Sequence, residues 1–249
     1  VKANKRTFIF SKKDGQLKGV SVDNRKISFA NGPRFIGARR ADRSLDQFYN
    51  HDDEKAKEKD RTYSEFPDAA VFTKLDVKQD GGDLVVTANY KLGNLDKAQW
   101  TINPSGDLAL DYTYNFSGVV DLMGIRFDYP EDQVISKRWL GAGPYRVWQN
   151  RIHGTQYDVW ENDYNDPIPG ETFTYPEFKG YFGDVSWMNI QTKEGTISLT
   201  NETPDTYIGV YQPRDGRDRL LYTLPESGIS VLNVIPPVRN KVNSTDLCG

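Results

Sequence analysis

Short segments with alternating apolar and polar residues run through most of the chain. Five of them are rich in β-branched and aromatic residues, which is typical of strands that bury one face. They span residues 7–10, 84–90, 108–114, 135–140 and 196–200. The pattern predicts an all-β fold, either a sandwich or a barrel.

Turn-forming residues separate these segments. Gly, Pro, Asn and Asp occur together at five places, namely Asp14-Gly15, Asn31-Gly32-Pro33, Asp80-Gly81-Gly82, Pro104-Ser105-Gly106-Asp107 and Asp215-Gly216. Such pairs favour tight turns because Gly accepts a positive φ and Pro has a fixed φ. The first and third are predicted to close β-hairpins.

Residues 52–61 are the one segment with helical composition, because they are dense in Glu, Lys, Ala and Asp. They have no apolar stripe and are therefore predicted to form a short solvated helix or a loop. A metal site at His51-Asp52-Asp53-Glu54 is disfavoured, since adjacent residues rarely converge on one ion. Residues 238–249 are expected to form an irregular tail, and both ends of the chain fit a domain excised from a longer protein.

Composition excludes several classes of function. The 249 residues include 32 Lys and Arg against 35 Asp and Glu, a formal net charge of -3. This balance provides no basic face for nucleic acid. The mean hydropathy is -0.68 and no apolar run approaches a membrane span. Cys248 is the single cysteine, so no disulfide can form within the chain. Neither a cofactor nor a metal is predicted.

Four of the five tryptophans lie between residues 138 and 187, among Arg, Asn, Asp and Glu. Aromatic faces suit the C–H side of a sugar, and the polar groups suit its hydroxyls. Gly141, Gly143 and Pro144 are predicted to form a tight turn. Tyr145, Trp148 and Arg151 follow this turn, and contact with sugar and packing against the chain are equally compatible with the pattern.

The same residues resemble a known family. The relevant motifs are Phe8-x-Phe10 with Asp14-Gly15-Gln16-Leu17, Gly124-Ile125-Arg126-Phe127, Trp139-Leu140-Gly141-x-Gly143-Pro144-Tyr145, Asn150-Arg151-x-x-Gly154, Tyr175-Pro176-Glu177-Phe178-Lys179-Gly180-Tyr181 and Val234-Ile235-Pro236-Pro237. Together they are similar to the last large β domain of family 2 glycoside hydrolases of the β-galactosidase type.

The resemblance implies a β-supersandwich like that of galactose mutarotases, with two large antiparallel sheets, formed by residues 1–249 as one domain and with at most one or two short helices. It also implies that the catalytic glutamates lie in a separate barrel. Such a barrel needs about 250 residues of alternating strand and helix, which this chain cannot supply. No catalytic residue is therefore expected here. The implied role is to support the barrel and to contribute to sugar binding.

The sequence departs from the family at two places. Arg40-Ala41 is followed by Asp42-Arg43-Ser44, where the family usually continues with Pro-Thr-Asp-Asn-Asp. Residues 215–226 lack the tryptophan that β-galactosidases carry on a late loop, and Tyr222 is the nearest aromatic residue. Specificity for galactose therefore stays open.

The candidate residues for binding carbohydrate come from these loops. They are Tyr145, Trp148, Arg151, His153, Glu177, Lys179, Tyr181 and Tyr222. Trp139 and Trp187 are expected in the core. For residues 162–166, a solvated acidic loop is favoured over a Ca²⁺ site because no EF-hand spacing is present.

Three functions follow from these observations. The leading one is a non-catalytic domain whose partners are a β-galactoside-like carbohydrate and the other domains of its parent enzyme. The second is an autonomous carbohydrate-binding module. The third is a mutarotase-like enzyme, for which His153 and Glu177 are the one acid–base pair to name. A periplasmic or secreted location is expected if the parent degrades polysaccharides in a bacterium.

Overall fold

The computed structural model describes residues 1–40, 63–163, 180–211 and 224–237. The described residues form antiparallel strands joined by short turns, with one 3₁₀ turn, η1 (Glu131–Gln133), and no α-helix. The strands are β1 (Lys2–Ala3), β2 (Arg6–Phe10), β3 (Leu17–Val22), β4 (Arg25–Ile27), β5 (Ala30–Arg40), β6 (Tyr63–Glu65), β7 (Val71–Asp80), β8 (Asp83–Lys91), β9 (Leu95–Ile102), β10 (Leu108–Tyr114), β11 (Leu122–Asp128), β12 (Val134–Gly143), β13 (Gln156–Asp163), β14 (Trp187–Thr192), β15 (Gly195–Thr200), β16 (Tyr207–Val210) and β17 (Ile229–Val234).

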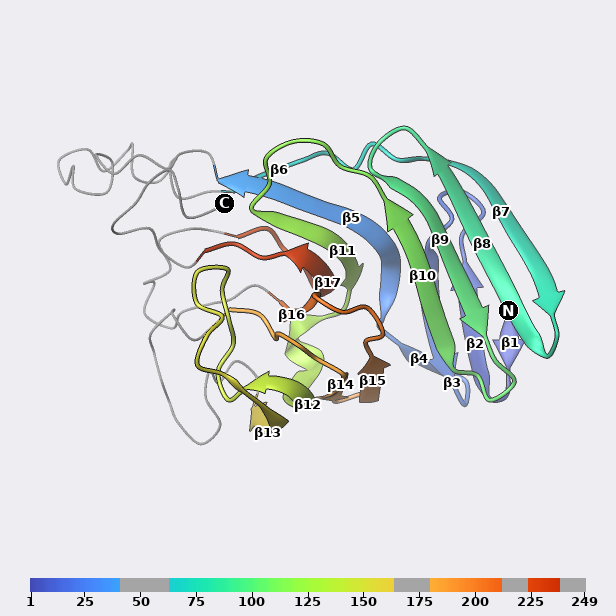
Figure 1. Cartoon of the computed structure of the whole chain (residues 1–249). Helices are drawn as coiled ribbons and strands as arrows, with labels where there is room; N and C mark the ends of the chain where they lie inside the picture. Colours follow the sequence, from blue (N-terminus) through green and yellow to red (C-terminus); the bar gives the residue numbers. More distant parts are fainter. Residues whose placement is uncertain (41–62, 164–179, 212–223, 238–249) are drawn as a thin grey trace. The chain divides into compact units, whose positions relative to one another are not determined.

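These strands form three sheets (Figure 1). The largest has the order β1-β2-β3-β5-β11-β17-β16, with β4 on β3 and β6 on β5, and the two others are β10-β9-β8-β7 and β13-β12-β14-β15. The predicted all-β, sandwich-type fold is thus confirmed. Within the described residues, no helix is long and apolar enough to cross a membrane.

The chain divides into two compact units. Unit 1 comprises residues 1–36, 67–118 and 125–130, and unit 2 comprises residues 37–66, 119–124 and 131–249. Strands β5 and β11 contribute residues to both units.

Unit 1 buries aromatic residues between its strands. Trp100 on β9 is 3% exposed and lies 6.0 Å from the ring of Phe10 and 5.9 Å from that of Phe127. Ala98, Trp100 and Ile102 alternate with partly exposed residues along β9, as expected for a strand with one buried face. Tilted aromatic pairs of this kind each add about 0.5–1.5 kcal/mol to the burial of apolar area.

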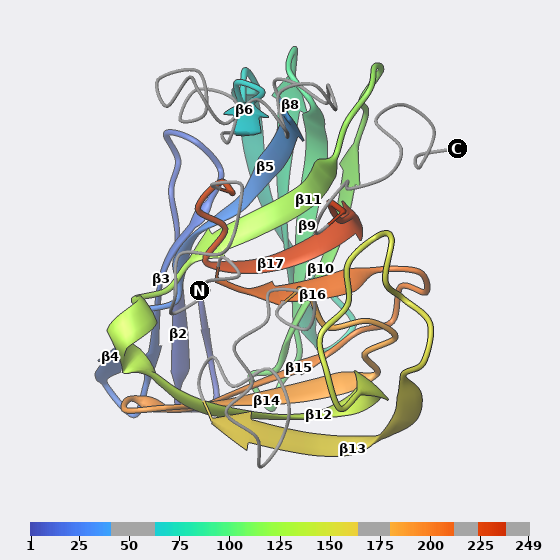
Figure 2. The same cartoon turned by 90° about the vertical axis from the view of Figure 1, so that its left-hand side faces the viewer.

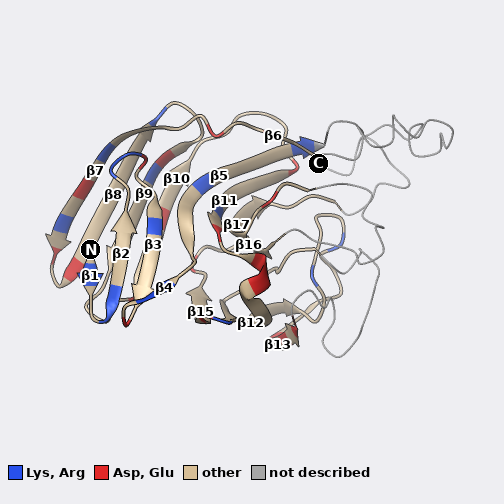
Figure 3. Ribbon diagram, turned by 180° about the vertical axis from the view of Figure 1, so that it is seen from behind, with Lys and Arg blue, Asp and Glu red and all other residues tan. Residues whose placement is uncertain are grey.

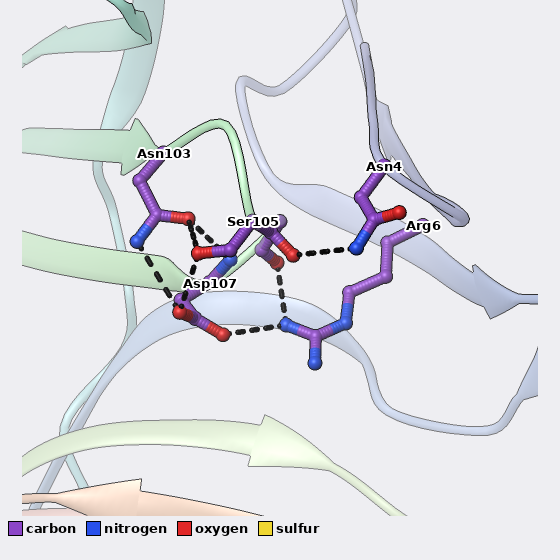
Figure 4. Close-up of polar contacts among 6 residues, drawn as sticks. Asn4, Arg6, Asn103, Ser105 and Asp107 are labelled. Atoms are coloured by element: carbon purple, nitrogen blue, oxygen red, sulfur yellow. Dashed lines mark hydrogen bonds and ion pairs between the residues drawn. The ribbon is translucent and has the colours of Figure 1, made fainter.

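A polar network joins two turns of unit 1 (Figure 4). Arg6 on β2 donates to the carbonyl oxygen of Gly106 at 2.8 Å and to the carboxylate of Asp107 at 2.7 Å. Asn4 donates to the carbonyl oxygen of Ser105 at 3.2 Å. The hydrogen bond from Arg6 is the main reason that the pKa of Asp107 is lowered, followed by hydrogen bonds from Asn103 and Ser105. The network ties the β9–β10 turn to the β1–β2 turn.

Strand β7 is at the end of its sheet and is rich in charge (Figure 3). Lys74 and Asp76 form an ion pair at 2.8 Å, and Lys78 and Asp80 form another at 3.4 Å. Charged side chains on an edge strand discourage pairing with a further strand. The charged side chains of β7 are therefore explained by protection of the sheet edge, and they do not require a ligand.

The core of unit 2 lies against the sheet β13-β12-β14-β15. Trp139 on β12 is fully buried, pairs with Met188 on β14, and lies 4.8 Å from the ring of Phe182. This confirms the expected core position of Trp139. Trp187 pairs with Leu140 and therefore points to the opposite face of the sheet, where it is partly exposed. The expectation that Trp187 belongs to the core was wrong, because its position in the register places it outside.

Both predicted hairpins are confirmed. Gly15 has φ +74° in the turn between β2 and β3, and Gly81 has φ +60° between β7 and β8. The prediction at Asn31-Gly32-Pro33 was wrong, because these residues lie inside β5. A Cβ on Gly32 would lie 2.2 Å from Cδ1 of Phe127, so this glycine permits close packing within a strand.

The tight turn predicted at Gly141 and Gly143 was also wrong, since both are residues of β12. A Cβ on Gly141 would be 3.0 Å from backbone atoms of residues 183–185, and a Cβ on Gly143 would be 2.4 Å from Cδ1 of Trp160. Neighbouring backbone and an indole ring therefore occupy the space that side chains would need. The predictions for residues 51–61, 215–216 and 238–249 fall outside the described residues.

Candidate functional site

Residues 144–155, between β12 and β13, form a long loop with a turn at its centre, and the loop holds four of the predicted sugar-binding residues (Figure 2). Trp148 and Arg151 close the turn by two backbone hydrogen bonds, from Arg151 N to Trp148 O at 2.8 Å and in the reverse direction at 3.3 Å. The hydroxyl of Tyr145 donates to the carbonyl oxygen of His153 at 3.4 Å. Gly154 has φ +92°, and a Cβ there would lie 2.6 Å from the Tyr145 oxygen. The Asn150-Arg151-x-x-Gly154 motif thus shapes this turn.

Trp148 and Tyr181 pack against each other beneath the turn. Their rings are 5.8 Å apart and nearly perpendicular, at 86°, and the residues are 1% and 2% exposed. Val147 and Tyr181 exchange two backbone hydrogen bonds, both of 2.7 Å. Burial raises the pKa of the Tyr181 phenol, which therefore stays neutral. In this structure both rings are packing residues, which was one of the two alternatives that the sequence left open for Trp148.

Of the remaining candidates, the structure brings three to the turn. Arg151 and His153 are exposed and Tyr145 is partly buried. Glu177, Lys179 and Tyr222 lie outside the described residues, so the proposed pairing of His153 with Glu177 is untested. The turn therefore presents one guanidinium and one imidazole to solvent from a backbone held in place by Trp148 and Tyr181.

Two buried cations flank Phe182, and the sequence analysis missed them. Lys137 is 1% exposed with its ammonium 5.7 Å from the ring centroid, and Arg146 is 3% exposed with its guanidinium 5.8 Å from the same centroid. Cations at this distance are attracted to the face of an aromatic ring. The signal for Lys137 was present, because it is two residues from Trp139 and so shares the inner face of β12.

Two carboxyl groups of the described residues have shifted pKa values, and neither shift suits a general acid. A general acid of glycoside hydrolysis needs a carboxyl group with a raised pKa. Burial acts to raise the pKa of Asp14, but hydrogen bonds from Lys18, Ser11 and the amide of Gln16 outweigh it and the pKa is lowered. The pKa of Asp107 is lowered as well. Both shifts are opposite to the requirement.

The described residues contain no group of three His, Cys, Asp or Glu side chains that could hold a metal ion. The predicted acidic loop at 162–166 is only partly described. Asn162 is 5% exposed within β13, and Asp163 ends that strand. Asn162 is therefore a strand residue that faces the interior, opposite Lys137.

Comparison with known proteins agrees with the motifs described above. The family model described as beta galactosidase small chain matches residues 2–231. None of the curated proteins matches the chain. The family match covers β1 to β16 and the first half of β17, together with the chain that follows β12. On this match, the chain belongs to the beta galactosidase small chain family.

Proposed function

We propose that the chain is a non-catalytic component of a family 2 glycoside hydrolase of the β-galactosidase type. It supports the catalytic barrel of that enzyme and contributes polar contacts to the sugar from the turn between β12 and β13. The family match over residues 2–231 is the observation that carries this proposal. The all-β composition of the described residues agrees with it, because a catalytic barrel would require alternating helices.

The construction of the turn supports its role in binding. Arg151 and His153 are exposed, whereas the rings beneath them are buried and fixed. A rigid base lowers the entropy that a polar side chain loses when it binds a ligand. A guanidinium and an imidazole can each donate hydrogen bonds to sugar hydroxyls. The turn is thus built to hold donors in place, and carbohydrate is the ligand that the family match favours.

The test is turnover of nitrophenyl β-galactoside by the purified chain, alone and together with the barrel of a family 2 enzyme encoded in the same gene or operon. We expect no turnover by the chain alone and a gain in activity when it joins the barrel. Turnover by the chain alone that disappears when its own carboxylates are replaced would refute the proposal.

The contribution of the turn is tested in the assembled enzyme. Replacing Arg151 with Ala is expected to raise KM roughly tenfold, because a hydrogen bond from a charged donor contributes about 1.5–3 kcal/mol. The value of kcat should change less, because a contact made equally in the ground state and the transition state affects binding alone. Arg25→Ala is the matched control, because Arg25 is an exposed arginine of β4 in unit 1. An unchanged KM in Arg151→Ala would remove the turn from the sugar site.

A further inference from the structure

The sheet β13-β12-β14-β15 has a second, outward face that the proposed function does not use. The strand register places Val159, Leu140 and Trp187 in one row across β13, β12 and β14. The next row along the same face consists of Glu161, Arg138, Asn189 and Ser198. We call the surface formed by these two rows and by Tyr157 the outer platform.

The outer platform exposes apolar surface. Val159 is 41% exposed and Trp187 is partly exposed. Tyr157 is 58% exposed although its hydroxyl is hydrogen-bonded to the hydroxyl of Ser186 at 2.6 Å. Single exposed apolar residues are common, whereas several that lie side by side mark a surface for interaction.

The position of Tyr157 is fixed by this hydrogen bond. Tyr157 is on β13, opposite Ala142 of β12, whereas Ser186 directly precedes β14. The side chain must therefore cross β12 to reach Ser186. Ala142 points to the same face and is nevertheless only 6% exposed, as expected if the tyrosine ring covers it. A ring that lies along the sheet and is held at its hydroxyl presents a flat, preordered face to solvent.

The polar row beside it carries balanced charge. Arg138 and Glu161 are 3.9 Å apart, with side chains that are 59% and 66% exposed. Asn189 and Ser198 continue the row with an amide and a hydroxyl, both of which can donate and accept hydrogen bonds. One cation and one anion leave this row without net charge, so it complements a neutral polar ligand and offers no basic patch to a phosphate.

We propose that the outer platform binds a neutral oligosaccharide. The C–H faces of the sugar rings stack on Tyr157 and Trp187, and the hydroxyls hydrogen-bond to Arg138, Glu161 and Asn189. Adjacent strands lie about 4.8 Å apart, close to the length of one sugar ring, so a chain that runs across the strands places successive rings over successive strands. This site needs no catalytic barrel, and it would keep the enzyme on a polymeric substrate between cleavage events.

The experiment measures binding of galacto-, xylo- and cellohexaose to the full chain by isothermal titration calorimetry. We expect at least one hexaose to bind more tightly than its monosaccharide. Tyr157→Ala and Trp187→Ala should each weaken binding about threefold to tenfold, as loss of one aromatic contact implies. Tyr157→Phe keeps the ring and should retain most of the affinity. Arg25→Ala, on β4 in unit 1, should bind the hexaose as the unaltered chain does.

A measurement on the unaltered chain tests the proposal even if the alanine variants fail to fold. In an NMR titration, the indole N–H signal of Trp187 should shift with hexaose while that of the buried Trp139 should not. Absence of binding by all three hexaoses, or affinity unchanged in both alanine variants, would overturn the proposal. So would a dimer of the unaltered chain in sedimentation that dissociates on Trp187→Ala, because a second copy would then be the occupant. Each of these results leaves the supporting role of the chain standing.

Discussion

Replacement of Gly180 by Ala should strongly destabilise unit 2. A Cβ at this position would lie 1.8 Å from the carbonyl oxygen of Val147 and 2.5 Å from its carbonyl carbon. These atoms are backbone and cannot rotate away as a side chain would. Val147 also makes the two 2.7 Å hydrogen bonds with Tyr181, so any displacement that admits the methyl group lengthens both.

The magnitude follows from these contacts. Forcing a methyl group into a packed site costs about 1–3 kcal/mol, and each backbone hydrogen bond contributes about 1 kcal/mol. The free energy of unfolding should therefore fall by about 3–5 kcal/mol. In a chain of this size, 1 kcal/mol shifts Tm by about 2–4 °C, which predicts a decrease of roughly 6–20 °C.

Urea unfolding followed by tryptophan fluorescence is the appropriate assay, because unit 2 holds Trp139, Trp148, Trp160 and Trp187. Gly82→Ala is the control, since its nearest neighbour is Cγ of Pro104 at an ordinary 3.4 Å and its φ is not positive. It should change stability by less than about 1 kcal/mol. Equal stability of the two variants would refute the packing argument at Gly180.

Two further predictions concern stability. Trp139→Ala should lower the free energy of unfolding by about 3–5 kcal/mol, because it removes a fully buried indole and its 3.0 Å hydrogen bond to the carbonyl oxygen of Ala142. Urea unfolding measures this loss. A loss below about 1 kcal/mol would contradict the prediction. The folded-state pKa of Asp107 is lowered, so the carboxylate stabilises the fold above its unfolded pKa of about 4 and loses this effect as the pH falls through the lower folded value. The Tm of the unaltered chain should thus decrease more steeply than that of Asp107→Asn below about pH 4 in thermal melts, and parallel pH profiles would show that the hydrogen bond from Arg6 has no net effect.

A last prediction concerns alkaline pH. Burial, and secondarily the neighbouring Tyr112, raise the pKa of Tyr114 to about 12. The unfolded chain therefore ionises this phenol first, and its contribution to stability is complete below about pH 10 and is lost as the pH rises toward 12. Tyr114→Phe should lose less stability over this range in urea unfolding, and an equal loss in both proteins would contradict the shift.

Local sequence patterns predicted the strands and the tight hairpins well. The alternation in residues 84–90 and 108–114 reappears as β8 and β10, and Asp80-Gly81-Gly82 closes the β7–β8 hairpin. These features depend on interactions between residues close in sequence. Their chemistry is therefore visible in a short window of residues.

Glycines whose partners are distant in sequence were misread. Gly32 is required by Phe127, and Gly143 by Trp160. A glycine needed for a turn and a glycine needed for close packing look the same in the sequence. The adjacent prolines, Pro33 and Pro144, also favoured the prediction of turns at these positions. Only the tertiary contacts distinguish the two roles.

In the candidate site, too, features set by nearby residues could be predicted and features set by distant residues could not. Alternate residues of a strand share one face, so the buried position of Trp139 could be predicted from the pattern around it. The same rule places Lys137, two residues earlier, on the buried face. Trp148 lies outside the regular strands, so no alternation of buried and exposed residues indicates where its ring points. Tyr157 was overlooked because its role depends on Ser186, which becomes its neighbour only when β13 and β14 flank β12.

The motifs that identify the family therefore consist mainly of residues that pack the strands together. Trp139, Gly141 and Gly143 pack β12 against residues 183–185 and Trp160, and Gly180 admits the backbone of Val147. Substitution at these positions alters folding before it alters recognition. Arg151 and His153 are exposed, so packing restricts their identity less than it restricts that of the scaffold residues. Chains that share every scaffold motif can therefore differ at these exposed positions, where any recognition of a ligand would be determined.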